Sequence, residues 1–300
     1  MPEGHTLHRL AGRITDVFGG RIVRAGSPQG RFAAGAARVD GTRLLDADAW
    51  GKHLFIRFED DQLIHVHLGL YGTFEVDDDH AGASIPDPVG QVRLRLVRPA
   101  TSGEGAAHAD LRGATTCALL TPAEQAAVLA RIGPDPLRAD ADPDRAWSRI
   151  RRSSAPIGTL LMDQSVLAGV GNVYRAEVLF RHRIHPLRPG RTLRVSQWQA
   201  IWDDLVVLMT EGVGTGRIDT VRPEHTPEAM QRAPRVDDHG GEVYVYRRAG
   251  MPCHVCGRPV RTEVLGGRNL FWCARCQPIF RSRAGAGTGP DSPGTSRGRR

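Results

Sequence analysis

The sequence predicts an α+β protein of several domains. Strand-like alternation fills most of the first 120 residues, helix-like periodicity replaces it afterwards, and four of the five cysteines lie between residues 253 and 276. The 300 residues, of which 40% are hydrophobic, suffice for about two domains and a small appended module. We therefore expect a β-sandwich domain at 1–120, an interdomain segment at 121–135, a helical domain at 136–241, a cysteine unit at 242–280 and a tail at 281–300.

The first half is predicted to begin with one helix and to continue in strands. Apolar residues recur at helical spacing from Thr6 to Phe18, and two glycines then end the helix. Short segments of alternating apolar and polar residues follow at 54–58, 63–68 and 92–96, separated by polar turns. Successive short strands of this kind favour a β-sandwich preceded by the helix.

The second half carries helix start signals. Thr121 and Glu124 form a capping box around a proline at the first helical position. Further helices are predicted to begin near residue 143 and to span 157–163 and 198–209. The half that follows residue 135 is therefore expected to be helical up to the cysteine unit.

The cysteine unit has the spacing of a zinc site. Two Cys-x2-Cys pairs, sixteen residues apart, can deliver four thiolates to one tetrahedral ion: Cys253, Cys256, Cys273 and Cys276. Four thiolates leave no open coordination position, so we expect one structural Zn2+ per chain and regard His254 as a bystander. Between the pairs, Gly266-Gly267 predicts a hairpin turn that presents Arg268 outward, which suits phosphate binding.

Net charge carries little weight in this chain. The formal charge is +7, but residues 281–300 hold five arginines against one aspartate, so +4 of it belongs to the tail and +3 to the rest. The tail is rich in Gly, Ser, Pro and Arg and is expected to be disordered. Nucleic-acid binding must therefore be argued from individual basic residues.

Neither a membrane span nor a secretory signal is predicted. The chain has no apolar run long enough to span a bilayer, and acidic Glu3 stands where a signal peptide would be basic. Clustered cysteines suit a metal site in a reducing compartment, so we expect a cytosolic protein. The fifth cysteine, Cys117, lies in an apolar stretch and is expected to be an inert core residue.

Lys52 is the one lysine among the 40 residues counted as Lys plus Arg. Arginine can replace lysine as a surface charge, but its guanidinium is not deprotonated in proteins and cannot act as an amine nucleophile or proton carrier. Lys52 is therefore a candidate for chemistry, and the alternative is a lysine retained by chance.

The N-terminus offers a second amine. Removal of Met1 would leave Pro2 as a terminal secondary amine beside Glu3. An α-amino group titrates at about 7.7–8.0, so an appreciable fraction is an unprotonated nucleophile near neutrality. Taken alone, Pro2 would be interpreted as an ordinary second residue.

Two further patterns have both a functional and a structural interpretation. Gly169 and Gly171 precede a helix predicted to begin near Asn172, whose free N–H groups and side-chain amide could bind phosphate. Asn172 could equally be an ordinary helix cap. His65 and His67 share one strand face, which could suit a metal, but no third ligand is evident and we expect both to be structural.

Taken together, these features resemble the formamidopyrimidine-DNA glycosylase and endonuclease VIII family. The resemblance spans nearly the whole chain up to the tail, and its closest branch is the actinobacterial endonuclease VIII proteins. It is carried, in the family's order, by Pro2-Glu3-Gly4, Gly51-Lys52, residues 133–137, residues 163–175 and the four-cysteine finger with Gly267-Arg268.

The resemblance implies a helix-two-turn-helix domain that bears the zinc finger, with damaged DNA in the cleft between the domains. It implies a bifunctional DNA glycosylase and abasic-site lyase of base-excision repair. Pro2 would attack C1′ of the damaged nucleotide to form an imine, Glu3 would protonate the opening sugar, and β,δ-elimination would cut the strand. Lys52 would aid proton transfer and contact phosphate. Asn172 and Arg268 would hold the flanking phosphates, and Arg268 would assist the δ step.

The damaged nucleotide must leave the base stack, at a cost of a few kcal/mol, and side chains must fill the gap. Residues 68–72 resemble the family's insertion loop, with Leu70 and Tyr71 as wedges, and Arg112 is a third candidate. The formamidopyrimidine branch typically has methionine near Leu70 and phenylalanine soon after the arginine that matches Arg112, where this chain has Gly113-Ala114-Thr115. These departures favour oxidised pyrimidines as substrates.

Two alternatives stay open. One is the same chemistry on oxidised purines, chiefly 8-oxoguanine and formamidopyrimidines. The other is a non-catalytic zinc-finger DNA-binding protein, against which the joint presence of Pro2, Glu3 and Lys52 argues. We expect a monomer in the bacterial cytosol, associated with the nucleoid through damaged DNA and with no membrane partner.

Overall fold

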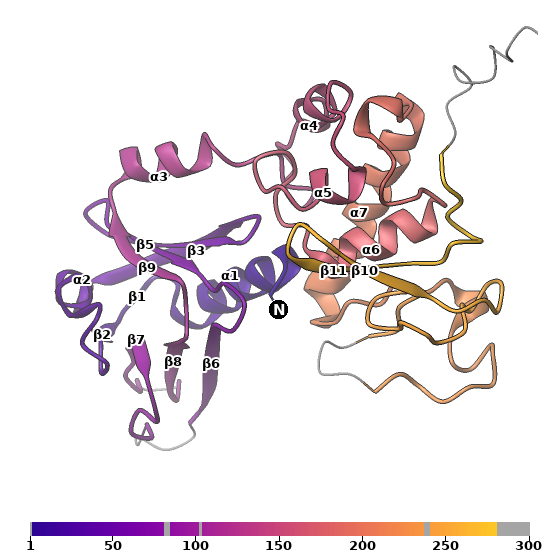
Figure 1. Ribbon diagram of the computed structural model, residues 1–300. Helices are drawn as coiled ribbons and strands as arrows, with labels where there is room; N and C mark the ends of the chain where they lie inside the picture. The colour runs from indigo at the N-terminus through magenta and orange to yellow at the C-terminus, as the bar shows by residue number, and fades with distance from the viewer. Residues whose placement is uncertain (1, 81–84, 102–103, 237–240, 281–300) are drawn as a thin grey trace, which may run out of the picture.

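The computed structural model describes residues 2–80, 85–101, 104–236 and 241–280. A strand-rich N-terminal half and a helical C-terminal half lie side by side, and helix α1 (Gly4–Phe18) reaches the junction between them (Figure 1). The predicted α+β multidomain fold is confirmed. The predicted disorder of the tail at 281–300 falls on residues outside the described ones.

Helix α1 couples the two halves. Its apolar face is buried against strand β3 (Arg43–Trp50) of the N-terminal half, as its amphipathic sequence predicts. The same helix packs against α7 (Val195–Thr215) of the helical half. Arg9 on α1 donates two hydrogen bonds, of 2.9 and 2.8 Å, to carbonyl oxygens near the end of α7. A shift of α1 would therefore disturb both halves.

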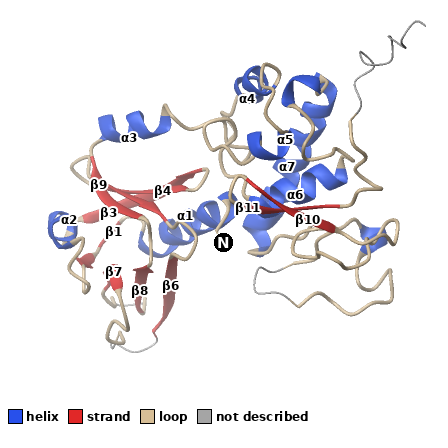
Figure 2. Cartoon of the chain, viewed as in Figure 1, coloured by secondary structure: helices blue, strands red, loops and turns tan. Residues whose placement is uncertain are grey.

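The N-terminal half is a sandwich of two antiparallel sheets, drawn in red in Figure 2. One sheet has the order β1-β3-β4-β5-β9 and the other has the order β2-β7-β8-β6. Helix α2 spans Ala33–Val39. The remaining strands are β1 (Arg21–Ile22), β2 (Arg24–Gly26), β4 (His53–Phe58), β5 (Leu63–His67), β6 (Thr73–His80), β7 (Val92–Arg98), β8 (Ala106–Arg112) and β9 (Thr116–Leu120).

The strands expected at 54–58, 63–68 and 92–96 are confirmed as β4, β5 and β7. Their inward apolar side chains meet those of α1 in one core between the sheets. Cys117 on β9 lies in this core, where burial raises the pKa of its thiol to about 12. The thiol therefore stays protonated and inert, as expected.

Helix α3 (Pro122–Leu129) lies in the predicted interdomain segment and contacts β5 and β9 of the N-terminal half (Figure 1), and its predicted capping box is present. Thr121 Oγ1 accepts a hydrogen bond from Glu124 N at 3.3 Å, and Glu124 Oε2 accepts one from Thr121 N at 2.8 Å. The other helices are α4 (Pro143–Ile150), α5 (Ile157–Leu160), α6 (Asn172–Arg181) and α7, with short 3-10 turns at Gly190–Thr192 and Pro223–His225. Among the described residues, no helix combines the length and the apolar character that a membrane span requires.

Helix α5 is shorter than the predicted 157–163. Asp163 Oδ1 accepts hydrogen bonds from both the backbone N–H and the hydroxyl of Ser165, at 2.9 and 2.8 Å. An aspartate that bonds to the backbone two residues later stabilises a turn in competition with a helix. The chain therefore leaves the helix at Leu160 and turns toward the loop before α6.

The cysteine unit contains one hairpin, β10 (Arg261–Leu265) and β11 (Arg268–Trp272), which lies beside α6 (Figure 1). The predicted turn is present at Gly266 and Gly267, whose φ angles are +59° and +73°. Two consecutive residues with positive φ make the type I′ turn that suits a two-residue hairpin, and glycine adopts it without steric cost.

Candidate active site

The Glu3 carboxylate is buried where the two halves meet. Its Oε2 accepts a hydrogen bond from Gly171 N at 2.8 Å, and its Oε1 accepts one from Val173 N at 2.8 Å. Tyr174 N adds a longer bond of 3.4 Å to Oε2. These N–H groups belong to the start of α6, where unpaired donors and the helix dipole favour a negative charge. The structure therefore holds an acceptor-only carboxylate directly behind the N-terminal residue.

Glycines permit this close approach. A Cβ added at Gly171 would lie 2.4 Å from Glu3 Cδ, and one added at Gly4 would lie 2.8 Å from Gly169 Cα. A Cβ at Gly51 would lie 2.9 Å from Gly169 N. The amide of Gly4 also donates to Gly169 O at 2.8 Å. Three segments that are distant in the sequence therefore meet backbone to backbone.

Lys52 follows one of these glycines, in the turn between β3 and β4, and is half-buried. Burial lowers the pKa of its amine from the ordinary lysine value; the Glu3 carboxylate opposes this shift and the Arg268 guanidinium adds to it. The charges of Glu3 and Arg268 thus both act on the amine of the lone lysine. A lowered pKa makes the amine a better proton carrier near neutrality than an exposed lysine.

Asn172 is buried and connects α6 to the hairpin. Its Nδ2 donates to Asn269 O at 2.9 Å, and its Oδ1 accepts a hydrogen bond from Arg175. The interpretation of Asn172 as an ordinary cap is wrong, because Gly171 is the N-cap residue of α6. Its predicted contact with phosphate stays a prediction.

Arg175, to which the sequence alone assigns no role, joins α6 to the hairpin and to α5. It is almost fully buried and donates to Asn269 O at 3.2 Å and to Gly158 O at 3.3 Å, besides its bond to Asn172. Burial lowers the pKa of its guanidinium to about 10, while Glu3 raises it and Arg268 lowers it further. The sequence signal is an arginine that directly follows Val173 and Tyr174 on a helix whose first turns are otherwise largely buried.

Arg268 lies at the start of β11, next to the glycine turn. It lines a pocket of about 260 Å3 between the hairpin and α6, together with Asn172, Tyr246, Arg247, Gly267, Asn269 and Phe271. Arg268 is half-buried in this wall, so it projects less than the turn alone predicts. The structure nevertheless brings Arg268 and Asn172 into one pocket, as the resemblance requires.

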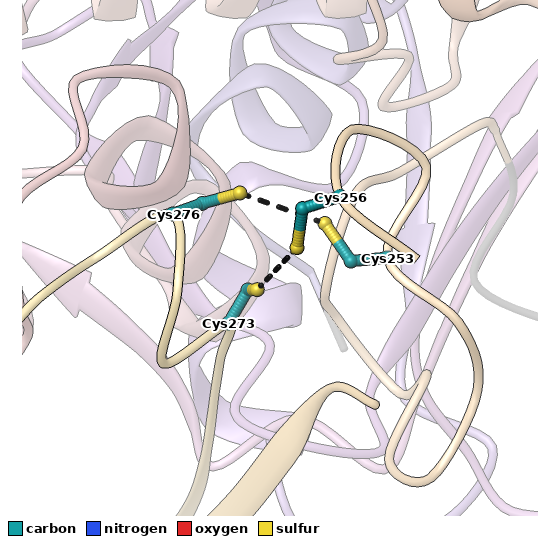
Figure 3. Close-up of side chains that lie close together, drawn as sticks. All are labelled: Cys253, Cys256, Cys273 and Cys276. Atoms are coloured by element: carbon teal, nitrogen blue, oxygen red, sulfur yellow. Dashed lines mark hydrogen bonds between the residues drawn. The ribbon is translucent and has the colours of Figure 1, made fainter. Parts of the chain in front are cut away.

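The four predicted cysteines point toward one centre (Figure 3). Their Sγ atoms all lie within 4.8 Å of one another, with 3.8 Å between Cys253 and Cys276 and 3.4 Å between Cys256 and Cys273. Four sulfurs at about 2.3 Å from a tetrahedral zinc are separated by similar distances. The quartet therefore fits a structural zinc. His254 lies outside it, with its ring 3.4 Å from Arg248, which confirms it as a bystander.

Comparison with known proteins agrees with this arrangement. Three family models match in succession: the formamidopyrimidine-DNA glycosylase N-terminal domain over residues 1–117, its H2TH domain over 132–222, and the zinc finger found in FPG and IleRS over 250–279. Endonuclease 8 1 of Mycobacterium tuberculosis is 53% identical over 281 residues, which cover 92% of this chain and 100% of the relative. The chain belongs to the formamidopyrimidine-DNA glycosylase and endonuclease 8 family.

More distant members support the same assignment. The formamidopyrimidine-DNA glycosylase of Parasynechococcus marenigrum is 31% identical over 287 residues, covering 92% of this chain and 99% of that relative. A solved complex between the Lactococcus lactis Fpg and an abasic site containing DNA matches with a TM-score of 0.71 at 20% identity, covering 92% of this chain and 100% of that chain. The predicted family fold is thereby confirmed, and the chain is a DNA glycosylase of base excision repair.

The predicted insertion loop, residues 68–72, lies between β5 and β6. Leu70 is 39% exposed and Tyr71 is 88% exposed, so both are free to meet a ligand. Arg112, in contrast, donates to Asp110 Oδ2 at 2.9 Å and to Glu75 Oε2 at 3.2 Å. Insertion into DNA would require Arg112 to leave two carboxylates, which makes it the weakest of the three predicted wedges.

His65 and His67 have a third histidine beside them, which the sequence reasoning overlooked. His53 Nδ1 lies 2.8 Å from His65 Nε2, and the ring centroids of His53 and His67 are 5.0 Å apart. Burial lowers the pKa of His53 to about 3 and that of His65 to about 4, so both are neutral near pH 7. Within the described ranges, the group that could hold a metal is the cysteine quartet, and the structural interpretation of the histidines stays a prediction.

Proposed function

We propose that this chain is a bifunctional glycosylase and abasic-site lyase that acts on oxidised bases, with pyrimidines favoured. The observation that carries the proposal is the meeting of the N-terminal segment, the Glu3 carboxylate and the Lys52 turn at one junction. Arg268 and Asn172 line the adjoining pocket. The name endonuclease 8 of the Mycobacterium tuberculosis relative, a strand-cutting enzyme, supports the lyase activity.

The reaction begins at the terminal amine. After removal of Met1, the Pro2 nitrogen forms a bond to C1′ of the damaged nucleotide while the bond from C1′ to the base breaks. The base leaves with the bonding electron pair as an anion and takes up a proton from water. Glu3 takes the proton that the attacking amine loses and passes it to the sugar ring oxygen as the ring opens. The three backbone hydrogen bonds hold the Glu3 carboxylate in place, and its negative charge stabilises the positive charge on the resulting imine.

Strand cleavage follows from the imine. Loss of a proton from C2′ expels the 3′ phosphate in the β step, and loss of a proton from C4′ expels the 5′ phosphate in the δ step. The buried Lys52 amine, whose pKa is lowered by burial, is suited to carry these protons. Arg268 and Asn172 hold the flanking phosphates, and Arg268 assists the δ step.

The lesion preference rests on the insertion loop. Leu70 and Tyr71 are exposed, and the chain has Gly113-Ala114-Thr115 where the formamidopyrimidine branch typically has a phenylalanine. The higher identity to endonuclease 8 1, 53% against 31% for the formamidopyrimidine-DNA glycosylase, supports the same preference. Oxidised purines are the second candidate, supported by the latter relative's name. We further infer a monomer that acts on damaged DNA in the bacterial cytosol, with no membrane partner.

A panel of oligonucleotides tests the proposal. Base release and strand cutting are measured on duplexes with thymine glycol, 5-hydroxycytosine, dihydrouracil, 8-oxoguanine or an abasic site. We expect cleavage of the abasic duplex and faster excision of the three pyrimidine lesions than of 8-oxoguanine. A protein with one extra glycine before Pro2 is the control and should lack lyase activity. Equal lyase activity of the extended protein contradicts the role of the terminal amine, and faster excision of 8-oxoguanine reverses the lesion preference.

A further inference from the structure

Asp135 is fully buried in the segment that joins the two halves. Its Oδ2 accepts a hydrogen bond from Gly51 N at 2.6 Å and lies 2.7 Å from His8 Nε2. Its Oδ1 accepts a hydrogen bond from Leu137 N at 2.9 Å. An ionised carboxylate only accepts hydrogen bonds, so His8 is the donor. One carboxylate therefore connects α1, the turn before Lys52 and the interdomain segment.

Residues close to Asp135 in the chain also contact the end of β3, just before the turn that carries Lys52. Trp50 Nε1 donates to Gly133 O at 3.1 Å. Arg138 donates to Ala49 O at 3.1 Å, and its guanidinium carbon lies 4.5 Å from the centre of the Trp50 ring. Gly133 and Arg138, which lie on either side of Asp135 in the chain, thus hold the end of β3 just before Gly51 and Lys52. Such contacts restrict a tight turn far more than its own sequence does.

We propose that Asp135 and His8 are positioning residues that fix the Lys52 amine relative to the N-terminal amine. His8 lies on the second turn of α1, the helix that begins directly after Glu3, whereas Gly51 directly precedes Lys52. Both segments bind the same carboxylate oxygen, so a displacement of one is transmitted to the other. This inference rests on the proposed function, in which the two amines act on one nucleotide.

A purely structural role for Asp135 would give a different pattern of effects. If it only joined the halves, its loss would lower the free energy of unfolding and slow every variant by the same factor. If it acts through Lys52, its loss should have little further effect once the Lys52 amine has been replaced. A double-mutant cycle with Lys52→Arg separates these cases.

Asp135→Asn keeps the size of the side chain and replaces one acceptor oxygen by an NH2 group. Single-turnover cleavage of an abasic duplex and the rate of borohydride trapping are measured, together with affinity for a duplex containing a reduced abasic analogue. We expect both rates to fall about 10- to 100-fold, because small misplacement of reacting groups has effects of this size. Affinity should stay within about twofold, and the Asp135→Asn/Lys52→Arg protein should be no slower than Lys52→Arg.

The matched control is Asp142→Asn, since the Asp142 carboxylate also accepts a backbone hydrogen bond, from Asp144 N at 2.9 Å, but is exposed at the start of α4 and has no hydrogen bond to the turn before Lys52. It should cleave at the rate of the unmodified protein. The pair His8→Leu and His8→Gln gives an independent test if Asp135→Asn does not fold. His8→Leu should be slow, and His8→Gln, which restores a donor, should recover most of the rate.

Two results would overturn the inference. One is full activity of both Asp135→Asn and His8→Leu. The other is that Asp135→Asn slows the Lys52→Arg protein by the same factor as it slows the unmodified protein. Failure of the proposed function gives a different result, because the unmodified protein would then neither trap nor cut lesion-containing DNA.

Discussion

The junction around Glu3 and the rim around the insertion loop are built in opposite ways. At the junction, polar groups are buried and their partners come from this chain: backbone N–H groups for Glu3, and Gly51 N with His8 for Asp135. At the rim, Leu70 and Tyr71 expose apolar surface that nothing in the described part of the chain covers. We infer that the chemical groups are placed before DNA arrives, whereas DNA itself completes the recognition surface.

The largest effect is expected from a methyl group inside the junction. Gly171→Ala places a Cβ 2.4 Å from Glu3 Cδ, so the carboxylate or the start of α6 must shift. We expect single-turnover cleavage to fall about 100-fold and the free energy of unfolding to fall by about 1–3 kcal/mol. Quenched-flow cleavage of an abasic duplex and chemical denaturation measure the two quantities.

Gly12→Ala is the matched control for this change. Gly12 lies on the exposed side of α1, and a Cβ there meets nothing within 4 Å. Alanine should stabilise the helix by about 0.5–1 kcal/mol and leave cleavage unchanged. If Gly171→Ala cleaved as fast as Gly12→Ala, the junction would not be a preorganised site.

The next largest effect is expected from loss of zinc, which should lower the affinity for DNA. Cys276→Ser, or chelation, removes a ligand from the quartet that holds the β10–β11 hairpin, and with it the Asn269 carbonyl that Asn172 and Arg175 bind. DNA affinity should fall at least about tenfold, since hydrogen bonds to charged groups contribute about 1.5–3 kcal/mol each. Zinc content and fluorescence anisotropy test this. Normal binding by the chelated protein would remove the finger from the interface.

At the rim, substitution of Tyr71 should slow excision of damaged bases and leave the stability of the protein nearly unchanged. Tyr71→Ala should alter the free energy of unfolding by less than about 0.5 kcal/mol, because the side chain is 88% exposed. It should slow excision of a damaged base about tenfold, since filling the gap offsets an unstacking cost of a few kcal/mol. Cleavage of an abasic duplex should change less, because no base has to be displaced. Equal slowing on the damaged-base duplex and the abasic duplex would indicate that Tyr71 acts in the chemical steps and not in filling the gap.

The smallest effect concerns one phosphate contact. Arg268→Ala should weaken binding to all sequences alike and reduce the slope of log affinity against log salt by about one contact. Preference among lesions should stay the same, because the residue is assigned to the DNA backbone. Titrations at several salt concentrations measure the slope, and an unchanged slope would exclude Arg268 from DNA binding.

Local patterns in the sequence were sufficient for much of this architecture. The cysteine spacing, the capping box at Thr121, the glycine turn before Arg268 and the strand alternation of β4 and β5 each depend on neighbouring residues. Asp135, Arg175 and His53 could not be assigned in this way. Their partners are distant in the chain, as with His8 and Asp135, which are 127 positions apart, so only the folded arrangement reveals what they hold.

One expectation from the sequence is altered by the structure. The ordinary pKa values of the two amines favour Pro2 as the nucleophile, because an ordinary lysine is almost fully protonated at neutral pH. Burial lowers the pKa of the Lys52 amine, which reduces this difference between the two amines. The two still differ in position, because Pro2 precedes the Glu3 carboxylate directly in the chain.

The identity of the trapped amine therefore tests the central claim most directly. After removal of Met1, the aliphatic amines of the chain are the Pro2 nitrogen and the Lys52 Nζ. Borohydride reduction during reaction with lesion-containing DNA should give a covalent complex, and peptide mapping by mass spectrometry should place the adduct on Pro2. Lys52→Arg should still be trapped, but more slowly. An adduct on Lys52, or full trapping by a protein with an extended N-terminus, would contradict the account.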